Sequence, residues 1–287
     1  MRIQGLLMAI PTIFFSFLLL YLVLWNFYYS FTNWSLLNPP HPSFVGFQTY
    51  ASLLSTEYFS ISFLHSILLS VGTVVFGNLL GLLFASLLYF LGNERMRSVY
   101  LSLLIYPLSI SMAANSLIWL WLFNIHIGIN WLLHLLHIPA LLWLSSPSTE
   151  FPSLMVVVIW AYAGLSLIFY LAAFMGVDKT LIEAARIDRA NPFRILFRVL
   201  LPNSMNGFIV SSALLFLFSF RIFSPPYLLS GGPTNIFLQT SVVYMYYLFT
   251  TEYFAQASAV ATIITAIATA VVIPYALYGI KRWMRHE

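Results

Sequence analysis

Long runs of apolar residues, separated by short polar segments, dominate the sequence. A helix needs about 20 apolar residues to cross the hydrocarbon core of a bilayer. Six stretches are long enough: 6–29, 64–91, 99–123, 151–175, 207–228 and 255–280. Pro107 and Asn115 interrupt the third, but membrane helices tolerate proline where neighbours satisfy the freed carbonyl. The pattern therefore predicts an all-α membrane protein with six transmembrane helices in a single domain, residues 1–287.

The first stretch follows Arg2 and so has the order of a secretory signal peptide. Its apolar run is too long for one, however, and no small-x-small cleavage site follows it. We therefore expect an uncleaved first span.

The composition identifies lipid as the solvent for most of the chain. Of 287 residues, 61% are hydrophobic and only 7% are charged, and the mean hydropathy is +0.91. Soluble domains carry about 25% charged residues. This balance excludes an ordinary soluble domain, a nucleic-acid-binding module and a disordered chain. The absence of cysteine from the sequence excludes disulfides and thiolate metal sites.

The positions of the twelve cations predict the orientation. Eleven lie before the first span, after the last, or in the loops between spans two and three and spans four and five. The other loops contain neither lysine nor arginine, and the twelfth cation, Arg221, falls within the fifth span. Because cytoplasmic loops are enriched in lysine and arginine, we expect both termini in the cytoplasm. The net charge of +4 is then a topology signal and not evidence for nucleic-acid binding.

The outer loops are polar and aromatic. Tryptophan and tyrosine near span ends fit an interfacial belt, which is a more frequent role than ligand binding. The segment WLLHLLH, 131–137, predicts a short amphipathic helix. His134 and His137 are spaced i, i+3, but a third metal ligand is not evident apart from the remote His126, so we expect no metal site.

One cytoplasmic segment, 177–203, concentrates five cations and three acids. Asp178 is placed to cap a first helix, and Asn191 followed by Pro192 is placed to open a second. Such a hairpin is suited to dock into a groove on another protein. The alternative is a solvated loop whose cations only set the topology, and that role would need no capping signals.

This segment carries a family resemblance. The run EAARIDRANPFRILFRVLLP, 183–202, resembles the EAA motif of inner-membrane permease subunits of binding-protein-dependent ABC importers. The matching positions are Glu183, Ala184, Ala185, Asp188, Ala190, Phe193 and Pro202. Three further segments resemble the sugar-permease branch, of the maltose and glycerol-3-phosphate type: FVGFQTY at 44–50, SGGP at 230–233 and YFAQASA at 253–259.

The resemblance implies the type I ABC importer transmembrane fold and a permease subunit that forms half of a pathway for carbohydrate uptake. The implied partners are a second permease subunit, which we expect to differ in sequence, two cytoplasmic ATPases and an extracytoplasmic binding protein at a prokaryotic cell membrane. The sequence has no phosphate-binding glycine loop, so ATP and Mg are expected on the ATPases, with no catalytic residue or cofactor on this chain. The alternatives are a permease for glycerol 3-phosphate or another small polar solute, and an ion-coupled secondary transporter, whose inverted repeats and intramembrane acids are not evident.

The resemblance also implies which residues couple transport to the ATPase. These are Glu183, Ala184, Ala185, Asp188, Arg189 and Ala190. Arg189 stands where the family has glycine, and a positive φ there would cost an arginine about 1 kcal/mol. Either Arg189 carries that strain or the turn shifts to Asn191, which tolerates left-handed geometry better. We expect the shift to Asn191.

Candidate pathway residues lie in the spans. Arg221 is the one charge within a span, which makes it a functional-site hypothesis, although it could also pair with a neighbouring subunit or snorkel outward. Aromatic rings, amides and hydroxyls hold sugars, and the candidates of these types are Asn115, Trp160, Tyr162 and Ser212. Each such polar group more often bonds between helices. On the outer side, the binding protein is expected to contact Tyr50 and the turn of Gly231, Gly232 and Pro233.

Overall fold

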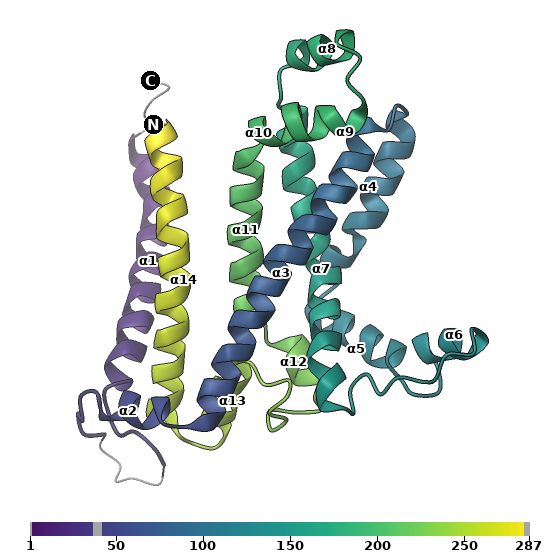
Figure 1. Ribbon diagram of the computed structural model, residues 1–287. Coiled ribbons are helices and arrows are strands. Elements are labelled where there is room, and N and C mark those ends of the chain that lie inside the picture. Colours follow the sequence, from purple (N-terminus) through teal and green to yellow (C-terminus); the bar gives the residue numbers. More distant parts are fainter. Residues whose placement is uncertain (1, 37–41, 284–287) are drawn as a thin grey trace.

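The computed structural model describes residues 2–36 and 42–283, and the regular elements in this range are all helical (Figure 1). In chain order they are α1 (Arg2–Tyr29), α2 (Gln48–Leu54), α3 (Glu57–Phe90), α4 (Glu94–Ser109), α5 (Met112–Leu122), α6 (Ile129–Leu135), α7 (Pro147–Met175), α8 (Lys179–Ile187), α9 (Pro192–Ile195), a π-helical turn (Leu196–Leu200), α10 (Leu201–Asn203), α11 (Met205–Phe220), α12 (Ser224–Leu229), α13 (Ser241–Thr250) and α14 (Phe254–Trp283). The all-α prediction is confirmed.

Five helical units within the described residues are long and apolar enough to cross a membrane. They are α1, α3, α7, α14 and the unit formed by α11 with α12 (Met205–Leu229). A sixth is obtained if α4 and α5 are counted as one broken span. The short amphipathic helix expected at 131–137 is present as α6, which begins slightly earlier.

The third predicted span, 99–123, is wrong as a single helix. α4 and α5 meet at an angle of 97°, and Ile110 and Ser111 between them are not helical. Pro107 lacks an N–H and lies in the last turn of α4, where Ile110 N–H bonds back to its carbonyl at 3.3 Å. Ser111 Oγ then accepts the Ala114 N–H at 3.2 Å and caps α5. The proline and the serine together end one helix and start another.

The centre of the molecule is formed by α3, α7 and α11, with α3 crossing α7 (Figure 1). Gly81 of α3 lies so close to α7 that a Cβ there would come within 2.3 Å of Ser166 Cβ. Nearby, Asn78 Oδ1 accepts hydrogen bonds from Ser166 Oγ (3.0 Å) and Ser211 Oγ (2.8 Å), and Asn78 Nδ2 donates to Ser212 Oγ (3.1 Å). Lipid gives little hydrophobic drive for helix association, so small residues and polar bonds of this kind hold membrane helices together.

The two ends of the molecule differ in charge. The start of α1, the end of α14, the turn between α3 and α4, and α8 lie at one end, whereas α2, α12 and α13 lie at the other (Figure 1). The first end contains the cation-rich segments, as the sequence predicts, and we call it the cytoplasmic end. The other is called the outer end. At one side, α1 packs along α14, and none of the apolar stretch of α1 from Ile10 to Tyr29 is buried within this chain.

Candidate functional site

The cytoplasmic hairpin, residues 177–203, begins with a capped helix. Asp178 precedes α8, and its carboxylate accepts the Thr180 N–H at 2.9 Å. This bond, together with the Thr180 side chain, holds the pKa of Asp178 below its usual value. Asn191 caps α9 in the same way by accepting the Arg194 N–H at 2.8 Å, and Pro192 follows at the first helical position. Both predicted caps are confirmed.

The expected shift of the hairpin turn to Asn191 is wrong. Arg189 itself has φ of +54°, whereas Asn191 has φ of −72°. The Arg189 N–H bonds to the Arg186 carbonyl and the Ala190 N–H to the Ala185 carbonyl, each at 3.0 Å. This pair of bonds is the Schellman motif, which requires the left-handed residue at the first position after the helix cap. Arg189 occupies that position, and Asn191 is needed to cap the next helix.

The hairpin presents charged and apolar side chains to the surroundings. Glu183, Ala184, Asp188 and Arg189 are exposed, and Ala185 and Ala190 are half-buried. Four large apolar side chains are exposed on the same element: Leu181 (46%), Ile187 (81%), Phe193 (70%) and Phe197 (48%). Exposed apolar side chains among charged ones are typical of a surface that binds another protein.

The other side of the hairpin is anchored to the membrane helices. Ile182, Ile195, Leu196 and Leu200 are buried in one cluster with residues of α3 and α7. The backbone between Leu196 and Leu200 is π-helical. Pro202 follows this turn and has no N–H to donate to the carbonyl four residues earlier, so the regular helical ladder is interrupted there. The hairpin is therefore attached to the spans through side-chain packing at its base.

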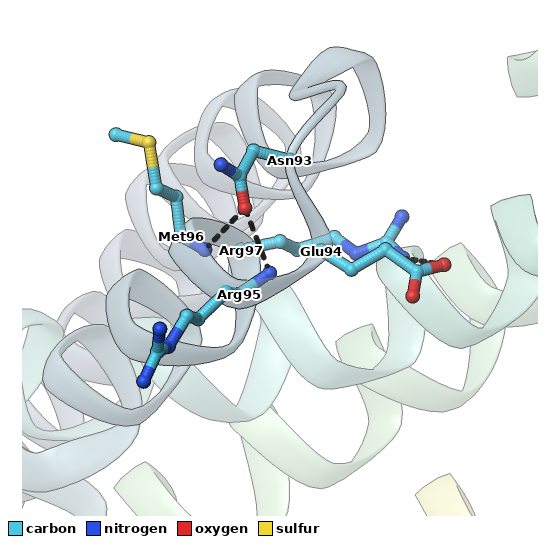
Figure 2. A network of polar contacts seen from close by, with 5 residues as sticks. All are labelled: Asn93, Glu94, Arg95, Met96 and Arg97. Carbon is cyan, nitrogen blue, oxygen red and sulfur yellow. Dashed lines mark hydrogen bonds and ion pairs between the residues drawn. The ribbon is translucent and has the colours of Figure 1, made fainter.

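The second cytoplasmic turn, between α3 and α4, is built by Asn93. Figure 2 shows its Oδ1 accepting the backbone N–H groups of Arg95 (3.0 Å) and Met96 (3.1 Å), which caps α4. Arg97 pairs with Glu94 at 3.5 Å, but Glu94 is largely exposed and such pairs contribute little stability. The capping role of Asn93 was not predicted, although an asparagine before a charged helix start is a recognisable signal.

At the outer end, Arg221 and Tyr162 line one pocket. Arg221 caps the end of α11 and lies in the break before α12, rather than inside a continuous helix. Its side chain is exposed, whereas Tyr162 of α7 is only 8% exposed. The pocket has a volume of ≈ 330 Å³ and is lined by Met112, Tyr162, Leu217, Phe218, Arg221, Ile222, Phe223 and Ser224. The break was missed in the sequence, although the adjacent Pro225 and Pro226 are a signal for a new helix start.

The other pathway candidates are not brought into this pocket. Trp160 packs edge-on against Trp119 and lines a separate apolar groove between α3, α4 and α7. Ser212 accepts the bond from Asn78 described above. Asn115 is fully buried, and its amide atoms have no hydrogen-bond partner among the described residues. These three stay predictions as pathway residues.

The outer turns are held by polar contacts. Tyr50 is half-buried, and its hydroxyl lies 2.6 Å from Ser30 Oγ. In the turn after α12, Gly231 has φ of +72° and Gly232 of +149°, which explains the two glycines. Gln239 Nε2 donates to the Pro233 carbonyl at 2.6 Å, which closes the turn. Contact of these residues with a binding protein remains a prediction.

The carboxylate of Glu150 ties this turn to α7, a role that was not predicted. Glu150 is only 5% exposed, and its Oε2 accepts Asn235 Nδ2 at 2.8 Å. A buried carboxylate needs such a partner to offset the cost of leaving water. The bond joins two segments far apart in the sequence, so no local signal reveals it.

Potential metal ligands do not cluster. Within the described part of the chain, no group of three histidine, aspartate or glutamate side chains could hold a metal ion.

Comparison with known proteins gives a consistent result. Residues 77–286 match the protein family described as "Binding-protein-dependent transport system inner membrane component". The glucose import system permease protein GlcT of Saccharolobus solfataricus is 61% identical over 285 residues, which cover 99% of this chain and 99% of that protein. The xylose/arabinose import permease protein XacH of Haloferax volcanii is 30% identical, with 90% of this chain and 82% of that protein covered.

Two solved structures share the fold. A crystal structure of a bacterial ABC transporter involved in the import of the acidic polysaccharide alginate contains a chain that matches with a TM-score of 0.82 at 22% identity, covering 96% of this chain and 94% of that one. A second crystal structure, of a bacterial alginate ABC transporter in complex with an alginate pentasaccharide-bound periplasmic protein, matches with a TM-score of 0.79 at 21% identity, covering 93% and 90%. The overall fold expected from the sequence is thereby confirmed.

Proposed function

The chain belongs to the inner membrane components of binding-protein-dependent transport systems, and on this premise we propose that it forms half of the transmembrane pathway of an ATP-driven carbohydrate importer. The single observation that carries the substrate class is the 61% identity to a glucose import permease along essentially the whole of both chains. The substrate we propose is a neutral sugar such as glucose. Family membership also excludes the ion-coupled secondary transporter.

The proposed partners are a second permease subunit of different sequence, two cytoplasmic ATPases that hold ATP and Mg, and an extracytoplasmic binding protein. The hairpin supports the ATPase contact, because it exposes Glu183 and also the large apolar side chains of Ile187 and Phe193. The charge fixes orientation and the apolar side chains supply buried area at the interface. The anchoring of Ile195 and Leu200 among α3 and α7 then transmits movement of the hairpin to the spans.

The pocket of Arg221 and Tyr162 is the proposed substrate contact on this subunit. The Arg221 guanidinium can donate hydrogen bonds to sugar hydroxyls, and the buried Tyr162 ring and hydroxyl form the adjacent wall. The pocket lies at the break between α11 and α12, where irregular backbone is tolerated because it lines a cavity.

Arg221 also favours a second candidate, an anionic solute such as glycerol 3-phosphate. A guanidinium pairs well with phosphate, and Arg221 is the one cation on the outer half of the sequence-predicted spans. If the first candidate is right, transport of glucose depends on this side chain. If the second is right, transport of glycerol 3-phosphate depends on it.

The test is uptake into proteoliposomes that contain the complete complex. Radiolabelled glucose should accumulate only with ATP inside the vesicles and binding protein outside, and glycerol 3-phosphate should not compete. Uptake of glycerol 3-phosphate in place of glucose would support the second candidate. Uptake that runs without ATP would contradict the proposal as a whole.

A further inference from the structure

A second polar pocket lies at the outer end, between the first outer loop and the start of α14. Its volume is ≈ 410 Å³, within the range of about 300–1,000 Å³ that is typical of small-molecule sites. The described residues that line it are Thr32, Asn33, Trp34, Ser35, Val45, Gln48, Thr49, Ser52, Tyr253, Ala255 and Gln256. It shares no lining residue with the Arg221 pocket, so a ligand bound here would not contact Arg221 at the same time.

Hydrogen bonds between distant segments hold the walls of this pocket in place. The Ala255 N–H donates to the Trp34 carbonyl at 2.9 Å and the Leu36 N–H to the Glu252 carbonyl at 3.3 Å, which joins the outer loop to α14. Thr49 Oγ1 donates to the Thr32 carbonyl at 2.7 Å, which joins α2 to the same loop. The pocket is therefore formed before a ligand arrives, which lowers the ordering cost of binding.

The Trp34 ring is also fixed in position. It packs against the rings of Tyr29 (4.5 Å between centroids) and Phe254 (4.9 Å). It remains half-buried and contributes to the pocket wall.

The polar groups of the pocket match a hydroxyl-rich ligand. The side chains of Gln48 and Gln256 carry amides, which both donate and accept hydrogen bonds, as sugar hydroxyls do. Tyr253 adds a phenolic hydroxyl and Trp34 an aromatic surface. Such a combination of aromatic rings with a few polar groups is typical of small-molecule sites.

The charge around the pocket favours a neutral ligand over an anion. None of the described lining residues is charged. The nearest acid in the sequence is Glu252, which is exposed and directly precedes Tyr253. A carboxylate next to the site disfavours a phosphate or carboxylate ligand.

We infer that this pocket is an external binding site for a neutral mono- or disaccharide, held by the amides of Gln48 and Gln256 against Trp34 and Tyr253. The inference rests on the proposed carbohydrate function and adds a second sugar site to it, on the outer face and separate from the Arg221 pocket. A sugar bound here would be retained at the membrane surface beside the pathway.

The experiment measures equilibrium binding of radiolabelled glucose to the complete transporter in nanodiscs, without the binding protein. The variants are Gln48→Met and Gln256→Met, which remove the amides at similar side-chain volume, and Arg221→Gln as a control that alters the other pocket. Each methionine variant should weaken glucose binding to the sites in this outer pocket about tenfold, since each loses hydrogen bonds to the sugar. Binding at these sites should be unchanged in Arg221→Gln, and glycerol 3-phosphate should not compete for them. Thermal unfolding of each variant checks that it is folded.

Three results would overturn the inference and leave the proposed function unaffected. The proposed function is tested separately, by ATP-driven uptake in the wild type. The first is the absence of saturable glucose binding to a complex that still transports glucose. The second is binding that Arg221→Gln abolishes and both glutamine variants retain. The third is unchanged glucose binding in the glutamine variants together with a loss of ATPase stimulation by the binding protein, which would make the pocket a protein-docking surface.

Discussion

The cytoplasmic hairpin and the outer break between α11 and α12 both interrupt the membrane helices, but for different reasons. In the hairpin, the caps and the turn are made by residues within the segment itself, from Asp178 to Asn191. At the outer break, α11 ends at Phe220 and α12 starts at Ser224, with Pro225 and Pro226 buried against other elements. α12 packs mainly on α5 and α7.

The difference follows from the surroundings of the backbone. In water, polar backbone groups at a helix end are satisfied by a nearby side chain or by solvent, so a local sequence is sufficient. At membrane depth, irregular backbone is tolerated only where it is covered by protein or lines a cavity. A break there depends on helices that are distant in the sequence.

The largest expected effect is that of Glu183→Lys in the hairpin. Charge reversal in a protein interface costs several kcal/mol, so ATP-driven uptake should fall about 100-fold. The loss should be in the maximal rate, because Glu183 is at the opposite end from the Arg221 pocket. Glu94→Lys is the matched control, since Glu94 is an exposed acid at the same end, weakly paired with Arg97. Equal uptake by the two variants would remove Glu183 from the coupling contact.

The packing that supports both regions is tested by Gly81→Ala. The added Cβ would clash with Ser166 where α3 crosses α7, and overpacking of this kind should lower the free energy of unfolding by about 2 kcal/mol. Gly92→Ala is the control, because nothing lies within 4 Å of a Cβ there. The measurement is unfolding of the purified chain in mixed micelles. A stable Gly81→Ala variant would mean that α3 and α7 can separate at no cost.

Arg221→Ala tests the outer pocket against the hairpin. Losing a charged hydrogen-bond donor to the substrate should raise the KM for glucose uptake about tenfold and leave ATP hydrolysis nearly unchanged. Arg95→Ala removes an exposed arginine at the cytoplasmic end and should change neither quantity. If Arg221→Ala instead lowered only the maximal rate, the pocket would act in gating and not in substrate contact.

The smallest effect is expected for Arg189→Gly. Glycine relieves a φ of +54°, so the hairpin should gain about 1 kcal/mol against local opening. Arg186→Gly, inside α8, should have the opposite sign and a similar size. Hydrogen exchange of the hairpin amides measures both. If hydrogen exchange is not slower in Arg189→Gly than in the wild type, the turn is not strained by Arg189.

Much of the fold could be predicted from the sequence. The apolar stretches predicted the helical class, and the cations predicted which segments share one end of the molecule, as Figure 1 shows. The caps at Asp178 and Asn191 were predictable because capping is a local interaction. The bend at Ile110 was missed because Pro107 was treated as tolerated within a span, although the Ser111 cap lies next to it.

Less of the candidate site could be predicted. The sequence marks Arg221 as the one charge within a predicted span, but the residues that line the pocket with it come from α5, α7, α11 and α12. Of the other candidates, only Tyr162 joins it. The polar group of Ser212 bonds to Asn78 instead, since helices in lipid satisfy such groups among themselves. The residue types favour Asn191 over Arg189 for a positive φ, but the Schellman bonds at the end of α8 place that φ at Arg189.

The sequence by itself determined the apolar spans and the capped hairpin, and it predicts the orientation of the chain, because hydrophobicity, charge and capping act within a few residues. Only the tertiary structure decided which polar groups meet. It joined Asn78 to Ser166 and Ser211, and it placed Arg221 beside Tyr162. The physical reason is that a polar group inside the membrane has no water as a hydrogen-bond partner. Its position is therefore set by the distant helix that can supply a partner.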